Sequence, residues 1–120
     1  MGRLKISRTV LSDMRKHNQE FVKLGPVLRS RLWKYNHAGE RVHLRGLLVA
    51  FQRDGFIHIG WSLCRHNLDV YSREAALYYA VTNAVHVGSL IGNENAAPFS
   101  IKEEISQMIG RSSRYFKKAS

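Results

Sequence analysis

The sequence has few of the residues that mark disulfide-rich or membrane proteins. Its single cysteine, Cys64, cannot form an intramolecular disulfide and provides no metal-ligand spacing. Such cysteine usage is typical of a reducing compartment. No segment has the charged start and apolar run of a signal peptide, and none approaches the length of a membrane span. We therefore expect a cytoplasmic protein that has no membrane partner.

Acidic residues are also scarce, and the charge is unevenly distributed. The formal net charge is +10. Residues 1–65 hold 13 Lys/Arg and 4 Asp/Glu, a net charge of +9, whereas residues 66–110 hold 2 and 5, a net charge of −3. The last ten residues contain four cations and no acid. An excess of this kind favours polyanionic partners, such as nucleic acid or an acidic protein surface.

Enough apolar sequence is present for one folded domain. The chain has 120 residues, of which 44% are hydrophobic and 10% aromatic. A chain of this length buries roughly two thirds of its unfolded surface. We predict a single α+β domain over residues 1–110, followed by a basic, flexible tail over residues 111–120.

The apolar residues concentrate in a predicted β-hairpin, Arg41–Gln52 followed by Phe56–Cys64. If Asp54 and Gly55 are the central residues of a tight turn, Arg53 pairs with Phe56 and the register is fixed. One face of the hairpin is then apolar: Leu44, Leu48, Ala50, Ile57, Ile59, Trp61 and Leu63. The opposite face holds His43, Arg45, Leu47, Val49, Phe51, His58 and Cys64. We expect two flanking helices to cover the first face, and Gly46 and Gly60 to admit close neighbours.

The flanking elements complete the predicted fold. Ser7–Leu24 has helical apolar spacing and Val27–Tyr35 alternates like a strand, with a short helix as its alternative. A long helix starts at Ser72, and Ser100 with Glu103 forms a capping box before a helix over residues 101–109 that Gly110 ends. The result is a three-stranded antiparallel meander packed against helices in the order α-β-β-β-α, plus a short C-terminal helix.

This order, over about residues 7–88, resembles that of double-stranded-RNA-binding domains. Members of that family carry a basic cluster at the start of the last helix, which grips phosphates. In this chain the matching segment is Ser72-Arg73-Glu74-Ala75-Ala76, in which Arg73 is the only cation.

A second resemblance is local. Phe56–Cys64 followed by Asp69–Ala84 is similar to a pattern in small accessory proteins of tailed bacteriophages. In that pattern a strand ends in a small-x-x-Cys-like step, and a loop leads to a helix with paired small residues. Asn83 stands where such helices tend to carry Arg. The resemblance implies a phage-encoded protein that acts in the cytoplasm of the host cell.

Cations interleave with aromatic residues on the strand Val27–Tyr35. Arg29, Arg31, Trp33 and Tyr35 share one parity, and Arg45, Phe51 and His58 of the hairpin could extend that face. Guanidinium groups hold phosphate and rings stack on bases. The predicted nucleic-acid-binding set is Arg8, Arg15, Arg29, Arg31, Trp33, Tyr35, Arg45, Arg111, Arg114, Lys117 and Lys118. In the structural alternative, the aromatic residues pack in a core or interface and the arginines form a solvated face.

No catalytic motif stands out, so we expect a non-enzymatic protein without metal or cofactor. His43 and His58 share a hairpin face but lack a third ligand, and Cys64 lacks an evident base. The leading hypothesis is an accessory protein that binds RNA or DNA. The alternative is a protein–protein inhibitor or adaptor that binds an acidic surface of a host enzyme or nucleoprotein complex, with Trp33 and Tyr35 as anchors.

Overall fold

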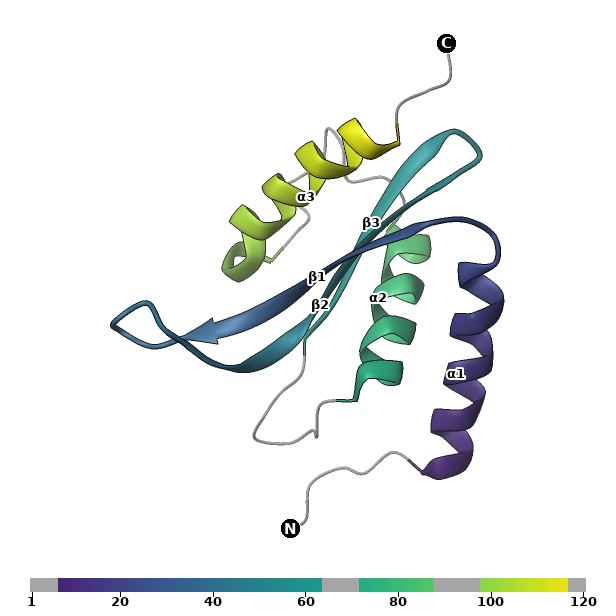
Figure 1. Ribbon diagram of the computed structural model, residues 1–120, viewed down its shortest axis with the longest axis horizontal. Helices are drawn as coiled ribbons and strands as arrows, with labels where there is room; N and C mark the ends of the chain where they lie inside the picture. Colours follow the sequence, from purple (N-terminus) through teal and green to yellow (C-terminus); the bar gives the residue numbers. More distant parts are fainter. Residues whose placement is uncertain (1–6, 64–71, 88–97, 117–120) are drawn as a thin grey trace.

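The computed structural model describes residues 7–63, 72–87 and 98–116. The elements are α1 (Arg8–Val22), β1 (Val27–Tyr35), β2 (Arg41–Arg53), β3 (Phe56–Leu63), α2 (Arg73–Val87), the 3-10 turn η2 (Phe99–Ile101) and α3 (Lys102–Tyr115). The strands form one antiparallel sheet in the order β1-β2-β3 (Figure 1). The predicted α+β class and α-β-β-β-α order are confirmed. No helix within the described residues is long and apolar enough to cross a membrane.

The predicted hairpin register is confirmed. Arg53 pairs with Phe56, Ala50 with Ile59, and Leu48 with Trp61. Asp54 and Gly55 both have positive φ, at 52° and 81°. Two successive positive φ angles are the mark of the tight turns whose twist matches that of antiparallel strands. Cys64, which follows β3, lies outside the described residues.

Side-chain caps set the starts of the first two helices. The Ser7 hydroxyl accepts a hydrogen bond from the Val10 amide at 3.2 Å, and the Ser72 hydroxyl accepts one from the Ala75 amide at 3.3 Å. Each satisfies a backbone donor that has no partner within the helix. The predicted start of the long helix at Ser72 is therefore confirmed.

Both faces of the sheet are covered (Figure 1). Helices α1 and α2 lie on the face of Leu47, Val49 and Phe51, and α3 lies on the face of Leu48 and Ala50. The expectation that the two flanking helices cover the Leu48 face was wrong. Gly46–Phe51 is buried without interruption, so this central part of β2 has no polar side. A strand of this kind needs a layer on each face.

Helix α3 also differs from its prediction. It runs through Gly110 to Tyr115, so the expected flexible tail is helical from Arg111 to that point. An apolar stripe explains the extension, because Met108 and Phe116 are both buried against the sheet cluster. Their burial offsets the roughly 1 kcal/mol that Gly costs within a helix. Ser100 does not cap the helix, because its N-cap is Ile101 and makes no side-chain cap hydrogen bond.

Side chains from the helices satisfy backbone groups of both edge strands. The Asn83 side-chain oxygen accepts from the Trp61 amide of β3 at 3.0 Å. On the other edge, Arg111 Nη1 donates to the Arg29 carbonyl of β1 at 3.1 Å. Such contacts protect an open sheet edge from pairing with another strand.

Helix α2 crosses β3 at Gly60. A Cβ added at Gly60 would come within 2.5 Å of the Ala84 Cβ and still closer to the Ala80 carbonyl oxygen. We predict that Gly60→Ala lowers the free energy of unfolding by about 1–3 kcal/mol, because the helix must move away from the strand. Urea denaturation measures this change. A stability equal to that of the unchanged protein would contradict the close packing.

Gly110 provides the opposite case. A Cβ there would meet only Arg114 Nη1, at an ordinary 3.6 Å. We predict that Gly110→Ala raises the free energy of unfolding by about 0.5–1 kcal/mol, because Ala favours the interior of a helix. The same denaturation experiment checks the sign. A loss of stability would show instead that the helix ends at Gly110, as the sequence alone suggested.

Candidate nucleic-acid interface

Strand β1 carries the predicted cations and aromatic residues, but its register against β2 shifts at two points. The shifts fall between Leu32 and Trp33 and between Lys34 and Tyr35. Arg31 pairs with Leu47, whereas Trp33 pairs with Leu44, which has the opposite parity on β2. Every residue of β1 has a partner on β2, whereas Val42 and Arg45 of β2 have none on β1, so the extra residues lie in β2. The prediction that Arg29, Arg31, Trp33 and Tyr35 share one face of β1 stays a prediction.

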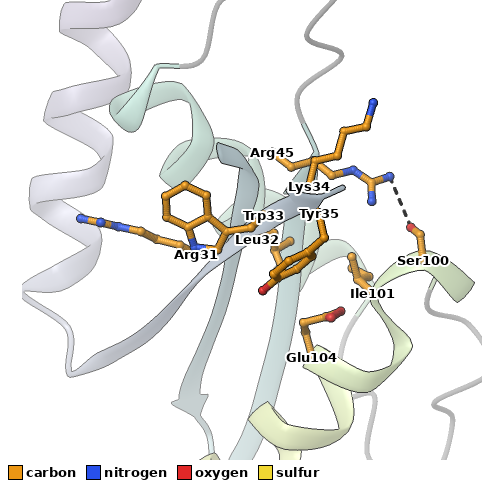
Figure 2. A pocket seen from close by; sticks show the side chains of 9 residues that line it. All are labelled: Arg31, Leu32, Trp33, Lys34, Tyr35, Arg45, Ser100, Ile101 and Glu104. Atoms are coloured by element: carbon orange, nitrogen blue, oxygen red, sulfur yellow. Dashed lines mark hydrogen bonds between the residues drawn. The ribbon is translucent and has the colours of Figure 1, made fainter. Parts of the chain in front are cut away.

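The last residues of β1, Arg31–Tyr35, form one side of a pocket of about 230 Å³ (Figure 2). Strand β2 contributes Arg45, η2 contributes Ser100 and Ile101, and α3 contributes Glu104. The lining residues are Arg31, Leu32, Trp33, Lys34, Tyr35, Arg45, Ser100, Ile101 and Glu104. Four predicted residues, Arg31, Trp33, Tyr35 and Arg45, thus meet at one pocket.

The cations of the pocket point in different directions. Arg45 Nη2 donates to the Ser100 hydroxyl at 3.4 Å, which ties β2 to the start of the α3 region. Figure 2 shows Lys34 and Arg45 extending toward the same side, whereas Arg31 extends away from them. The pocket therefore has one distinctly cationic end, and Arg31 contributes its charge to the neighbouring surface.

The two aromatic residues of the pocket differ in accessibility. The Arg41 guanidinium lies 5.0 Å from the centroid of the Trp33 ring, and Trp33 is half-buried. This cation–π contact holds the Trp33 ring of β1 against Arg41 of β2. It agrees with the structural alternative, in which Trp33 packs within the protein. Tyr35 is 51% exposed and presents a ring that a ligand can reach.

Further basic residues lie on β1 and near the end of α3, where the two elements are in contact. Arg111 reaches the backbone of Arg29, and Arg114 follows Arg111 by three residues on the same helix. We call the whole set the β1–α3 basic surface: Arg29, Arg31, Lys34, Arg45, Arg111 and Arg114. Among the described residues, none of its members forms an ion pair; the pairs found there are Arg15–Glu74 and Lys23–Glu20. The only carboxylate of the described residues that lines the pocket with these cations is that of Glu104, and it forms no ion pair with them.

Other predicted residues lie elsewhere. Arg8 and Arg15 belong to α1, in the helical layer on the other face of the sheet from α3. Arg15 Nη2 lies 3.5 Å from a Glu74 oxygen, so part of its charge is compensated. Lys117 and Lys118 lie outside the described residues.

The hairpin residues Phe51 and His58 do not extend a binding platform. Phe51 is only 3% exposed, stacks on His58 with centroids 5.4 Å apart, and meets Phe21 edge-on at 4.7 Å. The Arg53 guanidinium covers Phe21 at 4.5 Å. Phe51 therefore cannot extend the face of β1, because Phe21 of α1 packs on it, and the half-buried His58 stacks on Phe51. No cluster of three or more His, Cys, Asp or Glu with metal-binding geometry occurs among the described residues.

The sequence-based prediction missed Lys34, Ser100 and Glu104. Lys34 lies between the predicted residues Trp33 and Tyr35, so its charge could have been included from the sequence. Ser100 and Glu104 enter the site only because α3 packs across the Leu48 face of the sheet. No local pattern places those residues opposite β1.

Comparison of the chain with protein-family models, with curated proteins and with solved structures finds no match. The resemblances to phage accessory proteins and to double-stranded-RNA-binding domains stay predictions.

Proposed function

We propose that this protein is a non-enzymatic accessory protein that binds nucleic acid through the β1–α3 basic surface. The observation that carries the proposal is a group of cations on β1, β2 and α3 that form no ion pair among the described residues, several of which line a pocket with an exposed tyrosine. Cations arranged in this way bind phosphate and release the counterions condensed on the nucleic acid.

The spacing of the cations suits an extended backbone. Arg29 and Arg31 are two residues apart on β1, which corresponds to roughly 6–7 Å along a strand. Arg111 lies beside Arg29, and Arg45 lies at the pocket end. Contacts of this kind hold phosphates with little sequence readout, and a Tyr35 ring that stacks on a base tolerates any sequence.

The arrangement favours single-stranded nucleic acid over the docking mode that the α-β-β-β-α resemblance implies. In double-stranded-RNA-binding domains the start of the last helix grips phosphates. At the start of α2 the neighbour of Arg73 is Glu74, whose side chain faces Arg15. The proposal therefore places binding at β1 and α3 rather than at the start of α2, because an exposed ring and cations without ion pairs in the described part of the chain occur there. The local resemblance of residues 56–84 extends the proposal to a phage-encoded protein in the host cytoplasm.

A second candidate function is a protein–protein adaptor or inhibitor that binds an acidic surface of a host enzyme or nucleoprotein complex. The observation in its favour is an apolar rim beside the pocket, because Phe99, Val42 and Tyr35 are 88%, 54% and 51% exposed. Large exposed side chains of this kind anchor protein interfaces. Phe99→Ser separates the two functions, because it should weaken a protein contact and leave phosphate-driven binding unchanged.

We predict that replacing Arg31, Arg45 and Arg111 with Gln weakens the binding of single-stranded RNA or DNA and reduces its salt dependence. Each lost phosphate contact lowers the slope of log K against log salt by about 0.7, so the triple variant should lose about 2 from the slope. Fluorescence anisotropy with a labelled oligonucleotide at rising salt measures both quantities.

The matched control replaces Arg8 and Lys16 of α1 and its C-cap residue Lys23 with Gln, which changes the net charge equally. This control should keep the slope of the unchanged protein. Equal losses in the two variants would mean that net charge alone drives binding. A loss in the control alone would move the interface to α1, and the absence of any binding at low salt would reject the proposed function.

A further inference from the structure

The cationic pocket contains a carboxylate that phosphate binding does not explain. Glu104 lines the pocket together with Lys34, Tyr35 and Arg45. Its Oε2 atom is buried, and no donor among the described residues reaches it. A buried charged oxygen without a hydrogen bond is costly, and a negative charge also weakens the attraction for phosphate. Protein atoms cover this oxygen, so a ligand in the pocket reaches it only when the Glu104 side chain rotates; rotation toward a ligand that carries hydrogen-bond donors would remove the cost.

The chemistry of the pocket restricts that ligand. A cationic ligand would satisfy Glu104 but would be repelled by Lys34 and Arg45. An acidic peptide would suit those cations but would place a second carboxylate near Glu104. A ligand that joins an anionic group to a planar group with hydrogen-bond donors suits both the cations and Glu104. A nucleotide has this composition.

Size and layout agree with a single nucleotide. The pocket volume of about 230 Å³ is smaller than that of sites for drug-sized ligands, roughly 300–1,000 Å³, so it has room for one base. Figure 2 shows the Tyr35 ring and the Glu104 carboxylate on one side of the pocket, with Lys34 and Arg45 extending toward the other. Phosphate and base can therefore be held by different groups.

An ionised carboxylate accepts hydrogen bonds and donates none. It therefore favours a base edge made of adjacent donors. Guanine presents N1–H beside its N2 amino group, whereas adenine and cytosine place a ring acceptor beside their amino group, and uracil flanks its single N–H with two carbonyls. Unpaired bases are read by hydrogen bonds to these edges and by stacking on aromatic rings.

We infer that this pocket selects an unpaired guanine nucleotide within a bound single strand. Glu104 accepts from the N1–H and N2 amino groups, Tyr35 stacks on the base, and Lys34 and Arg45 hold its phosphate. The inference rests on the proposed function, since the β1–α3 basic surface supplies most of the affinity and Glu104 supplies the base preference.

The test uses labelled hexamers of uridine in which one central residue is guanosine, inosine or adenosine. We expect the guanosine oligomer to bind about tenfold more tightly than the adenosine oligomer, the ratio that a good pair of base contacts provides. Inosine keeps N1–H and lacks the amino group, so its affinity should fall between the two. This ligand series needs no variant and is therefore independent of any folding defect.

Glu104→Gln replaces one acceptor oxygen with a donor and should bring the ratio close to one. Affinity for the all-uridine hexamer should not fall, because the variant loses a negative charge. Glu103→Gln is the matched control, since Glu103 is exposed, does not line the pocket and changes the net charge equally. It should keep the guanosine preference.

The outcomes separate the two proposals. Equal affinity for the guanosine and adenosine oligomers, with salt-dependent binding retained, would overturn the guanine pocket and leave the proposed function standing. Loss of the preference in Glu103→Gln as well would also overturn the role of Glu104. Absence of binding to every oligomer would reject the proposed function itself.

Discussion

Burial of β2 on both faces is the constraint on which the remaining structure depends. Leu48, Val49 and Ala50 are all fully buried although their side chains alternate between the two faces. Burying one large aliphatic side chain contributes about 1.5–3 kcal/mol, so leaving either face in water would cost several such contributions. One helical layer cannot cover both faces. Helices α1 and α2 therefore take one face, where Gly60 lets α2 approach the sheet closely, and α3 takes the other.

The candidate site follows from the second of these layers. As α3 covers the Leu48 face, its start lies against the last residues of β1 and its last turns lie beside the start of β1. The pocket wall that holds Ser100 and Glu104 is thus created by packing that the core requires. A two-layer α-β-β-β-α domain without α3 would leave this face of the sheet open and would have no such pocket. The feature that departs from the resembled topology is therefore the one that builds the site.

The sequence predicted features that depend on neighbouring residues. The Asp54-Gly55 turn determined the hairpin register, and the Ser72 cap determined the start of α2. Features decided by distant packing were not predictable in the same way. The two apolar faces of β2 look alike in sequence, so the choice of covering helix was wrong, and the extra residues of β2 opposite β1 have no distinctive composition. Of the pocket residues, Arg31, Trp33, Tyr35 and Arg45 were predicted from β1 and β2, Lys34 was overlooked beside them, and Glu104 was missed because only tertiary contact brings it there.

The position of Glu104 decides how the site should be interpreted. Helix α3 is held to the sheet by Ile101, Ile105 and Met108, so its attachment does not require a carboxylate in the pocket. A surface selected only for phosphate affinity would gain from a neutral side chain at this position, because like charges near a binding site oppose the ligand. A carboxylate that lowers general affinity but matches particular donors raises the difference between correct and incorrect ligands. Glu104 also lies in the first turn of α3, where a carboxylate interacts favourably with the helix dipole. The inferred base selection would give the same charge a second role, because a residue that is unfavourable for indiscriminate binding is favourable for discrimination.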